Sequence, residues 1–202
     1  MSHSIKNCGI LIVAAGQSKR LGSPKQLLMY EGKTLINRLI DIVKETVDFP
    51  MLLVLGAHAE KIKAQLTKPS IAILLNESWA EGMGNSISSG LQALLQKNPA
   101  IDGVMILVCD QPFLKRHQIL SLLALQEKSG MPMAACYYAG VMGTPALFHT
   151  CTFPELLALK GDRGAKNIIN HNIQEVAKLQ FEQGLVDIDT EEDYKKLIKG
   201  KE

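Results

Sequence analysis

The sequence predicts an α/β fold in three layers, in which a mostly parallel, mixed sheet lies between two layers of helices. Short apolar runs alternate along the chain with segments whose apolar residues recur at helical spacing. The apolar runs are continuous, as in strands that are covered on both faces. The chain has 202 residues, 47% of them hydrophobic, and no linker rich in Pro, Gly or Ser. We therefore expect a single domain over residues 1–202.

Strands are expected at the short apolar runs. The run that begins at residue 102 ends at Asp110, because Pro112 cannot continue the hydrogen-bond ladder of a strand. The other expected strands are 8–16, 51–56, 71–76 and 133–139, and the last of these leads into a hairpin-like segment at 140–149.

Helices are expected between the strands. In the segment 34–47 the apolar residues fall on one face, and Thr34 is available as the N-terminal cap. Further helices are expected at 57–66, 85–96, 115–128, 154–159 and 190–198. The alternation of strands with helices favours parallel strand pairs.

Composition narrows the class of partner. The formal net charge of +2 is spread along the chain, so we expect neither nucleic acid nor a membrane surface as a partner. No apolar stretch approaches the length that spans a bilayer. The cysteines form no C-x-x-C pair, which indicates neither a zinc site nor a disulfide scaffold. A cytoplasmic protein with reduced thiols, acting on a small molecule, fits best.

Three segments follow predicted strands and should meet at the carboxyl edge of the sheet, where α/β proteins bind ligands. They are 16–25, 76–86 and 110–113. The first is glycine-flanked and basic, so its backbone amides and the side chains of Arg20 and Lys25 suit a triphosphate. It matches neither a Walker loop nor a dinucleotide-binding fingerprint. The alternative is a surface turn with solvated charges.

The same loop carries a resemblance. The stretch AAGQSKRLGSPKQLL, residues 14–28, resembles the signature loop of the nucleotidyltransferase superfamily with a Rossmann-like fold, although Leu21 stands where methionine is commoner. Five later segments resemble, in the same order, those of the molybdenum cofactor cytidylyltransferase group: EGMGNSISSGL, CDQPFL, GTPALF, GDRGAK and DIDTEEDY. The resemblance covers nearly the whole chain.

The resemblance implies transfer of a nucleotidyl group from a nucleoside triphosphate to a molybdopterin-type cofactor, with release of pyrophosphate. Such a reaction needs Mg²⁺ and basic side chains around the α-phosphate. Lys25, Arg20 and Asp110 are the candidate catalytic residues. Asp110 is the expected Mg²⁺ ligand at a strand end, or else a turn aspartate. Asp189 is a weaker second candidate ligand, and a helix start, where acidic residues complement the helix dipole without a metal, is the strong alternative.

The resemblance places the nucleobase between Ala14 and Ala15 of the first loop and the turn before the helix at 85–96. Small residues there leave room for a base, and Ala15 favours CTP because A-A-G resembles the cytidylyl-transferring members. Trp79 either lines the base pocket or covers the loop. The expected nucleotide-binding residues are Ala14, Ala15, Gly16, Ser18, Arg20, Gly22, Lys25, Gly82, Met83, Gly84 and Ser86.

The acceptor is expected against the later motifs, where Arg163 and Lys166 suit a phosphate; a capped helix start with solvated charges is the alternative. The expected acceptor-binding residues are Gln111, Pro112, Thr144, Pro145, Asp162, Arg163 and Lys166. His58 and Cys109 are interpreted as a helix-start residue and a buried strand residue.

Two other functions stay open. An enzyme of the same fold could transfer another nucleotidyl group to a different phosphate, such as a sugar phosphate or the acceptor of a guanylyl group. The chain could also be a carrier that delivers a molybdopterin to a partner without turnover. In the leading interpretation, a molybdenum hydroxylase would receive the product.

Overall fold

The computed structural model describes residues 3–68 and 71–199. Its main feature is a seven-stranded sheet in the order β5-β4-β1-β6-β8-β7-β9. The strands are β1 (Cys8–Ala14), β4 (Met51–Leu55), β5 (Ala72–Leu75), β6 (Gly103–Val108), β7 (Met133–Tyr138), β8 (Val141–His149) and β9 (Val176–Gln180). The pairs β5-β4, β4-β1, β1-β6 and β7-β9 are parallel, and β8 is antiparallel to both its neighbours. The predicted mostly parallel mixed sheet is confirmed.

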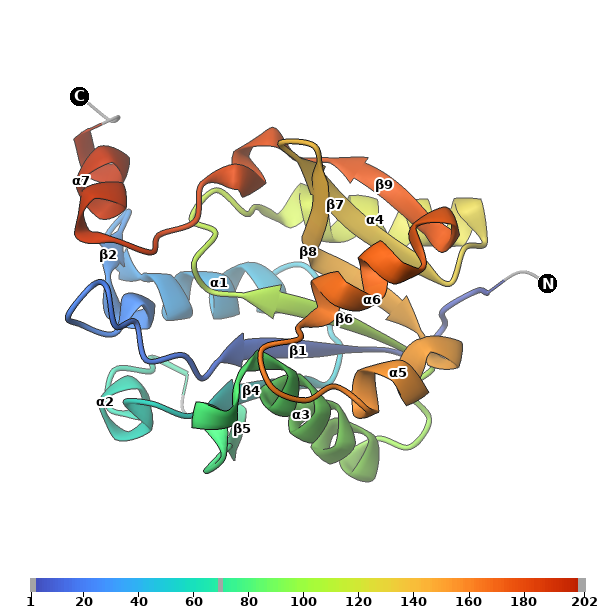
Figure 1. Ribbon diagram of the computed structural model, residues 1–202, viewed down its shortest axis with the longest axis horizontal. Helices are drawn as coiled ribbons and strands as arrows, with labels where there is room; N and C mark the ends of the chain where they lie inside the picture. Colours follow the sequence, from blue (N-terminus) through green and yellow to red (C-terminus); the bar gives the residue numbers. More distant parts are fainter. Residues whose placement is uncertain (1–2, 69–70, 200–202) are drawn as a thin grey trace.

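Helices cover both faces of this sheet, as Figure 1 shows. The helices are α1 (Leu35–Lys44), α2 (Ala59–Lys63), α3 (Met83–Lys97), α4 (Arg116–Ser129), α5 (Phe153–Leu157), α6 (Ala165–His171) and α7 (Glu191–Lys199). Along β1, Ile10 and Ile12 point into the core shared with α1, α2 and α4. Leu11 and Val13 point the other way, into the core shared with α3, α5 and α6. A strand buried on both faces explains the continuous apolar run.

A third, smaller core joins the C-terminal helix to the first loop. Tyr30, Leu35, Ile188 and Leu197 are buried together, and Leu21 packs against them. Tyr30 belongs to a short ribbon of β2 (Met29–Tyr30) and β3 (Lys33–Thr34). This core fixes the segment that carries Asp189 beside the loop that carries Arg20.

Several elements differ from the sequence-based expectations. β9 was not expected, because it is an edge strand in which only Val176 and Ala177 are buried and the apolar pattern is weak. The strands of the β2–β3 ribbon have two residues each, which is too short for any periodicity. α2 is shorter than the expected 57–66, and α3 begins at Met83, two residues before the expected start.

Within the described residues, the helices are too short and too polar for any of them to traverse a bilayer.

Candidate active site

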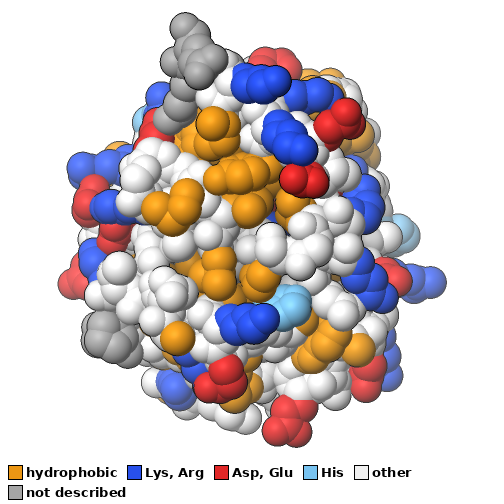
Figure 2. Space-filling view, turned by 90° about the vertical axis from the view of Figure 1, so that its left-hand side faces the viewer, with side chains coloured by type: hydrophobic (Ala, Val, Ile, Leu, Met, Phe, Trp, Pro, Cys, Tyr) orange, Lys and Arg blue, Asp and Glu red, His pale blue; other side chains and the backbone are white. Residues whose placement is uncertain are grey.

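The carboxyl ends of β1, β4, β5 and β6 lie at one edge of the sheet, and the three predicted ligand-binding segments meet there. They border a cleft with a volume of about 400 Å³. Figure 2, which faces this edge, shows hydrophobic side chains in the middle and upper parts of the surface, with basic and acidic side chains around them. The cleft is therefore partly apolar and partly charged, as a nucleotide requires.

The loop after β1 has a fixed shape. Its turns need positive φ at Ser18 (55°) and at Gly22 (67°), and the Lys25 amide donates to Ser18 Oγ at 3.0 Å. The buried side chain of Gln26 donates through Nε2 to the carbonyl oxygens of Ala14 at 2.9 Å and Gly16 at 3.3 Å. Gln26 is not among the predicted site residues. The sequence feature that could have indicated it is its position directly after Lys25 in the first loop.

Lys25 is the centre of the charged part of the cleft. Its Nζ donates to Asp110 Oδ2 at 2.5 Å and to Asp189 Oδ1 at 3.0 Å. Arg20 Nη2 donates to Asp189 Oδ2 at 2.6 Å. The side chains of Lys25 and Asp110 are each 18% exposed, whereas Arg20 is 68% exposed. The structure thus brings together the three predicted catalytic residues and Asp189, which lies 164 positions after Lys25.

Electrostatic interactions stabilise the charged forms of Lys25 and Asp189. Burial lowers the pKa of Lys25, but the charge of Asp110 and the hydrogen bonds to Asp110 and Asp189 offset it, and the net pKa is raised. Burial raises the pKa of Asp189, and its bonds with Lys25 and Arg20 lower it further than that, so the net shift is downward. Lys25 therefore presents a permanent positive charge at the floor of the cleft.

Asp110 binds Lys25 through only one of its two carboxylate oxygens. Among the described residues Asp110 Oδ1 is buried and has no hydrogen-bond partner, while Oδ2 is taken by Lys25. A carboxylate oxygen in this state suits a hard divalent cation. Each oxygen of Asp189 accepts one hydrogen bond, from Lys25 or Arg20, so a metal at Asp189 would share the carboxylate with two basic side chains.

Asp187 is not among the predicted site residues, and in the structure it lines a cavity next to the cleft. Partial burial, and then the negative charge of Asp110, raise the pKa of Asp187 to about 7. The backbone explains the proximity, because the amide of Ile188 donates to the carbonyl oxygen of Asp110 at 3.2 Å. This contact spans distant parts of the chain, and nothing in the spacing indicates it.

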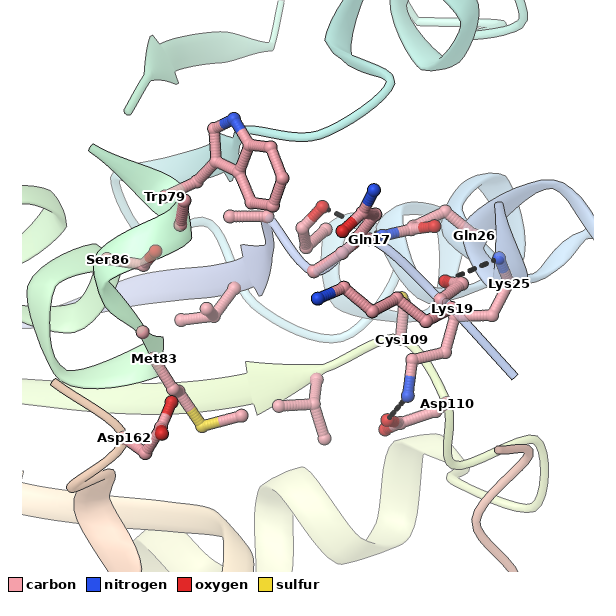
Figure 3. A pocket seen from close by; sticks show the side chains of 18 residues that line it. Gln17, Lys19, Lys25, Gln26, Trp79, Met83, Ser86, Cys109, Asp110 and Asp162 are labelled. Carbon is pink, nitrogen blue, oxygen red and sulfur yellow. Dashed lines mark hydrogen bonds and ion pairs between the residues drawn. The ribbon is translucent and has the colours of Figure 1, made fainter. Parts of the chain in front are cut away.

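Figure 3 shows Trp79, Ser86 and Met83 on the side of the cleft opposite Lys25. Ala15 is buried and also lines the cleft. Ser86 Oγ accepts from Asn76 Nδ2 at 2.9 Å and keeps its own proton for a ligand. Small residues and the indole of Trp79 therefore line this part of the cleft. Lys19 extends across the cleft in the same view.

The glycines of the turn before α3 allow the chain to approach itself closely, and the approach of a base to Gly82 and Gly84 stays a prediction. A Cβ on Gly82 would lie 2.3 Å from the carbonyl carbon and oxygen of Gly161, and one on Gly84 would lie 2.5 Å from the carbonyl oxygen of Arg163. The Gly84 amide also donates to Gly161 O at 2.8 Å. The close approach is to the chain itself, at the loop before α6.

A second cavity, of about 350 Å³, adjoins the first and shares with it Val13, Met83, Val108, Asp110 and Asp162. Thr144 and Lys166, both predicted to bind the acceptor, line it together with Asp187 and Tyr138. The other predicted acceptor residues, Gln111, Pro112, Pro145 and Arg163, are not among the described residues that line it. Gln111 is buried, and its Nε2 donates to the carbonyl oxygens of Thr144 and Gly184, so it shapes the wall.

Two residues behave as their simpler interpretations stated. Cys109 is buried, and burial raises the pKa of its thiol to about 12, so it is no nucleophile at neutral pH. His58 precedes α2 as its N-terminal cap residue. Its Nε2 lies 3.1 Å from the carbonyl oxygen of Gln17 and so supports the first loop.

Comparisons with known proteins show the family of this chain. The MobA-like NTP transferase domain matches residues 10–176 of the chain. The purine catabolism protein PucB of Bacillus subtilis is 29% identical over 199 residues, covering 91% of this chain and 92% of PucB. The nicotine blue oxidoreductase of Paenarthrobacter nicotinovorans is 32% identical over 128 residues, covering 63% of this chain and 60% of that protein.

Solved structures share the fold. Rv0371c from Mycobacterium tuberculosis H37Rv superposes with a TM-score of 0.80 at 24% identity, covering 98% of this chain and 100% of that one. A structure of Rv0371c in complex with manganese superposes with a TM-score of 0.78 at 23% identity, covering 96% and 99%. With the family match spanning most of the sequence, the chain belongs to the MobA-like NTP transferase domain family and is a nucleotidyltransferase.

Proposed function

We propose that this protein transfers CMP from CTP to a molybdopterin-type molybdenum cofactor and releases pyrophosphate. The observation that supports this most directly is the boundary between the two cavities. Asp110 and Asp162 line both of them, and the ammonium group of Lys25 is bound to Asp110. A triphosphate in one cavity and a phosphate-bearing acceptor in the other would meet at this boundary.

The first cavity suits the nucleotide. The part lined by Ala15, Trp79 and Ser86 would hold the base, and Lys19 and Lys25, which also line the cleft, would hold the phosphates. Arg20, on the same loop, would add a charge from the exposed end. The backbone amides of 16–22 add donors for phosphate oxygens. Gly84 holds the turn before α3 against the loop before α6, because its amide donates to Gly161 O. The remaining residues that we assign to the nucleotide are Ala14, Gly16, Ser18, Gly22, Gly82 and Met83.

The second cavity suits the acceptor. Val13, Ile87, Ile106 and Val108 give it an apolar floor against which a pterin ring can pack, and Thr144 and Asn167 supply polar contacts. Lys166 stands at the start of α6 and would pair with the acceptor's phosphate. Arg163 is exposed on the same loop.

In the proposed reaction an oxygen of the acceptor's phosphate attacks the α-phosphorus of CTP. A new P–O bond forms, the bond from the α-phosphorus to the bridging oxygen breaks, and its electron pair leaves with pyrophosphate. Lys25 holds a fixed positive charge where negative charge accumulates, and Arg20 adds a second charge at the exposed end. Because Asp110 and Asp189 already orient Lys25, little reorganisation is needed.

The donor set also fits a divalent metal, Mg²⁺ in this proposal. The Oδ1 atom of Asp110 would hold it, together with water and phosphate oxygens. A metal there would neutralise charge on the triphosphate and on the leaving pyrophosphate. Two further carboxylates line the cavities: Asp162 lines both of them and Asp187 lines the second.

The test is a donor and acceptor panel. Each of CTP, GTP, ATP and UTP is incubated with Mg²⁺ and either the molybdopterin-type cofactor or a sugar phosphate, and pyrophosphate release is measured. We expect release with CTP and cofactor together. Release with GTP instead, or with a sugar phosphate instead of the cofactor, would support the alternative transfer reactions. Binding of the cofactor with no release for any donor would support the carrier.

The base compartment has its own test. Ala15→Gly removes a methyl group from the wall, so the ratio of kcat/KM for CTP to that for GTP should fall, by up to about 10-fold. Ala57→Gly is the matched control, because Ala57 is equally buried and its amide donates to Ala15 O, but it does not line the cleft. A ratio that moves in neither variant would show that the base is recognised elsewhere.

A further inference from the structure

A cluster of metal-ligating side chains lies at the opposite edge of the sheet from the cleft. Within the described residues, His3, His149 and Cys151 each offer a ligand atom, and these atoms lie within 4.8 Å of one another. His149 is the last residue of β8 and pairs with Gly103 at the start of β6, whereas Asp110 follows the end of β6. Figure 1 shows the N-terminal segment reaching this edge near α5.

We propose that His3, His149 and Cys151 form a binding site for a zinc-class divalent cation, separate from the nucleotide cleft. Two imidazoles and a thiolate are the donors that Zn²⁺ prefers, and Mg²⁺ avoids them. With three protein ligands, the fourth tetrahedral position is open to water.

The distances are close to those of a metal site. Cys151 Sγ lies 3.7 Å from His3 Nδ1. In a tetrahedral zinc site, Zn–S and Zn–N bonds of about 2.3 and 2.0 Å place sulfur and nitrogen roughly 3.5 Å apart. The two imidazole rings have centroids 5.0 Å apart and an interplanar angle of 63°, so both can face a shared ion. Small side-chain rotations would complete the site.

The backbone around the cluster is built into the fold. The amide of His3 donates to Gly130 O at 3.1 Å, and its carbonyl accepts from the buried side chain of Gln126. A few residues on, Asp102 accepts from the amides of Lys6 and Asn7. The amide of Cys151 donates to His149 Nδ1 at 3.2 Å, and this hydrogen bond would give way when the ring offers its lone pair to an ion. The backbone that carries the ligands is therefore positioned before any ion binds, and the side chains rotate to complete the site.

Binding of the ion requires the thiolate of Cys151, so the thiol proton would leave to solvent as the bond to the ion forms. The bound ion would tie the N-terminal segment to β8 and stabilise the native chain.

Cobalt is the probe, because tetrahedral Co²⁺ absorbs in the visible and a cobalt–thiolate bond adds a charge-transfer band in the near ultraviolet. The full-length protein is titrated with Co²⁺ in excess Mg²⁺, so that carboxylate sites are occupied. We expect both absorptions to saturate at one Co²⁺ per chain and to disappear when Zn²⁺ is added. Zn²⁺ at about 100 times its Kd should raise Tm by roughly 5–10 °C.

Three variants locate the ion. Cys151→Ser should abolish the charge-transfer band and His3→Ala should weaken Co²⁺ binding at least 10-fold, and both should lose the rise in Tm. Both side chains lie at the surface, so the fold is retained. His117→Ala, an exposed histidine on α4, should bind Co²⁺ as the unmodified protein does. Absence of the band, or its persistence in Cys151→Ser, would overturn the proposal.

Discussion

The contact between the turn before α3 and the loop before α6 links the two cavities, and Gly82→Ala tests it. Gly82 has φ of 117° and ψ of 176°, a region that is almost confined to glycine and costs another residue about 1–3 kcal/mol. Its added Cβ would also lie 2.3 Å from Gly161 C and O and 2.7 Å from the amide nitrogen of Asp162. Backbone atoms cannot rotate away, so the clash adds about 1–3 kcal/mol.

Gly140→Ala is the matched control for this substitution. Gly140 also has positive φ, 81°, but a Cβ there meets nothing within 4 Å. The free energies of unfolding of both variants are measured by urea denaturation. We expect Gly82→Ala to lose about 1–3 kcal/mol more than Gly140→Ala.

Turnover of the folded variants gives the functional half of the test. Asp162 lines both cavities, and a displacement of its segment by about 1 Å should lower kcat/KM by up to 100-fold. Gly140→Ala should keep its activity, since it lies in the turn between β7 and β8. If the two variants had equal stability and equal activity, the contact would have no role in organising the cleft.

Three further predictions concern charge and hydrogen bonding. Lys25→Ala should lower kcat by about 10²–10³, and the exposed Arg20→Ala by less, with smaller changes in nucleotide Kd; equal losses in Kd alone would make the loop a binding element. Gln26→Leu should lower the free energy of unfolding by about 1–3 kcal/mol, because two loop carbonyls lose their donor; urea denaturation measures it. Burial raises the pKa of Asp41, but hydrogen bonds from two lysines lower it more. The resulting stability is present above pH 3.8 and lost as pH falls through the lowered pKa, so Asp41→Asn should lower Tm at pH 7 and by progressively less as the pH falls below 3.8; an effect that does not change with pH would contradict this.

Much of the site could be predicted from local sequence. Asp110 was placed at the edge of the sheet because an apolar run stops there and Pro112 follows. Lys25 and Arg20 were placed there because their loop follows the first strand. In each case the sequence signal lies within a few residues. Parallel strands then bring these residues together, because their carboxyl ends lie at the same edge of the sheet.

The partners of these residues could not be predicted in the same way. Asp189 reaches Lys25 through the small core around α7, and Asp187 reaches Asp110 through a backbone bond between distant segments. The need for glycine at Gly82 also depends on a loop that arrives from far along the chain. Such contacts depend on how the elements pack, which local periodicity does not encode.

The central claim is that a CMP group is transferred at the boundary of the two cavities, and isotope transfer measures it directly. CTP labelled at the α-phosphate is incubated with Mg²⁺, the molybdopterin-type cofactor and either the unmodified protein or Asp110→Asn. The account predicts that the label moves to the cofactor with one pyrophosphate released per label, and that Asp110→Asn, although folded, transfers none. Label that stays in CTP or CMP with the unmodified protein, or that moves equally well with Asp110→Asn, would contradict it.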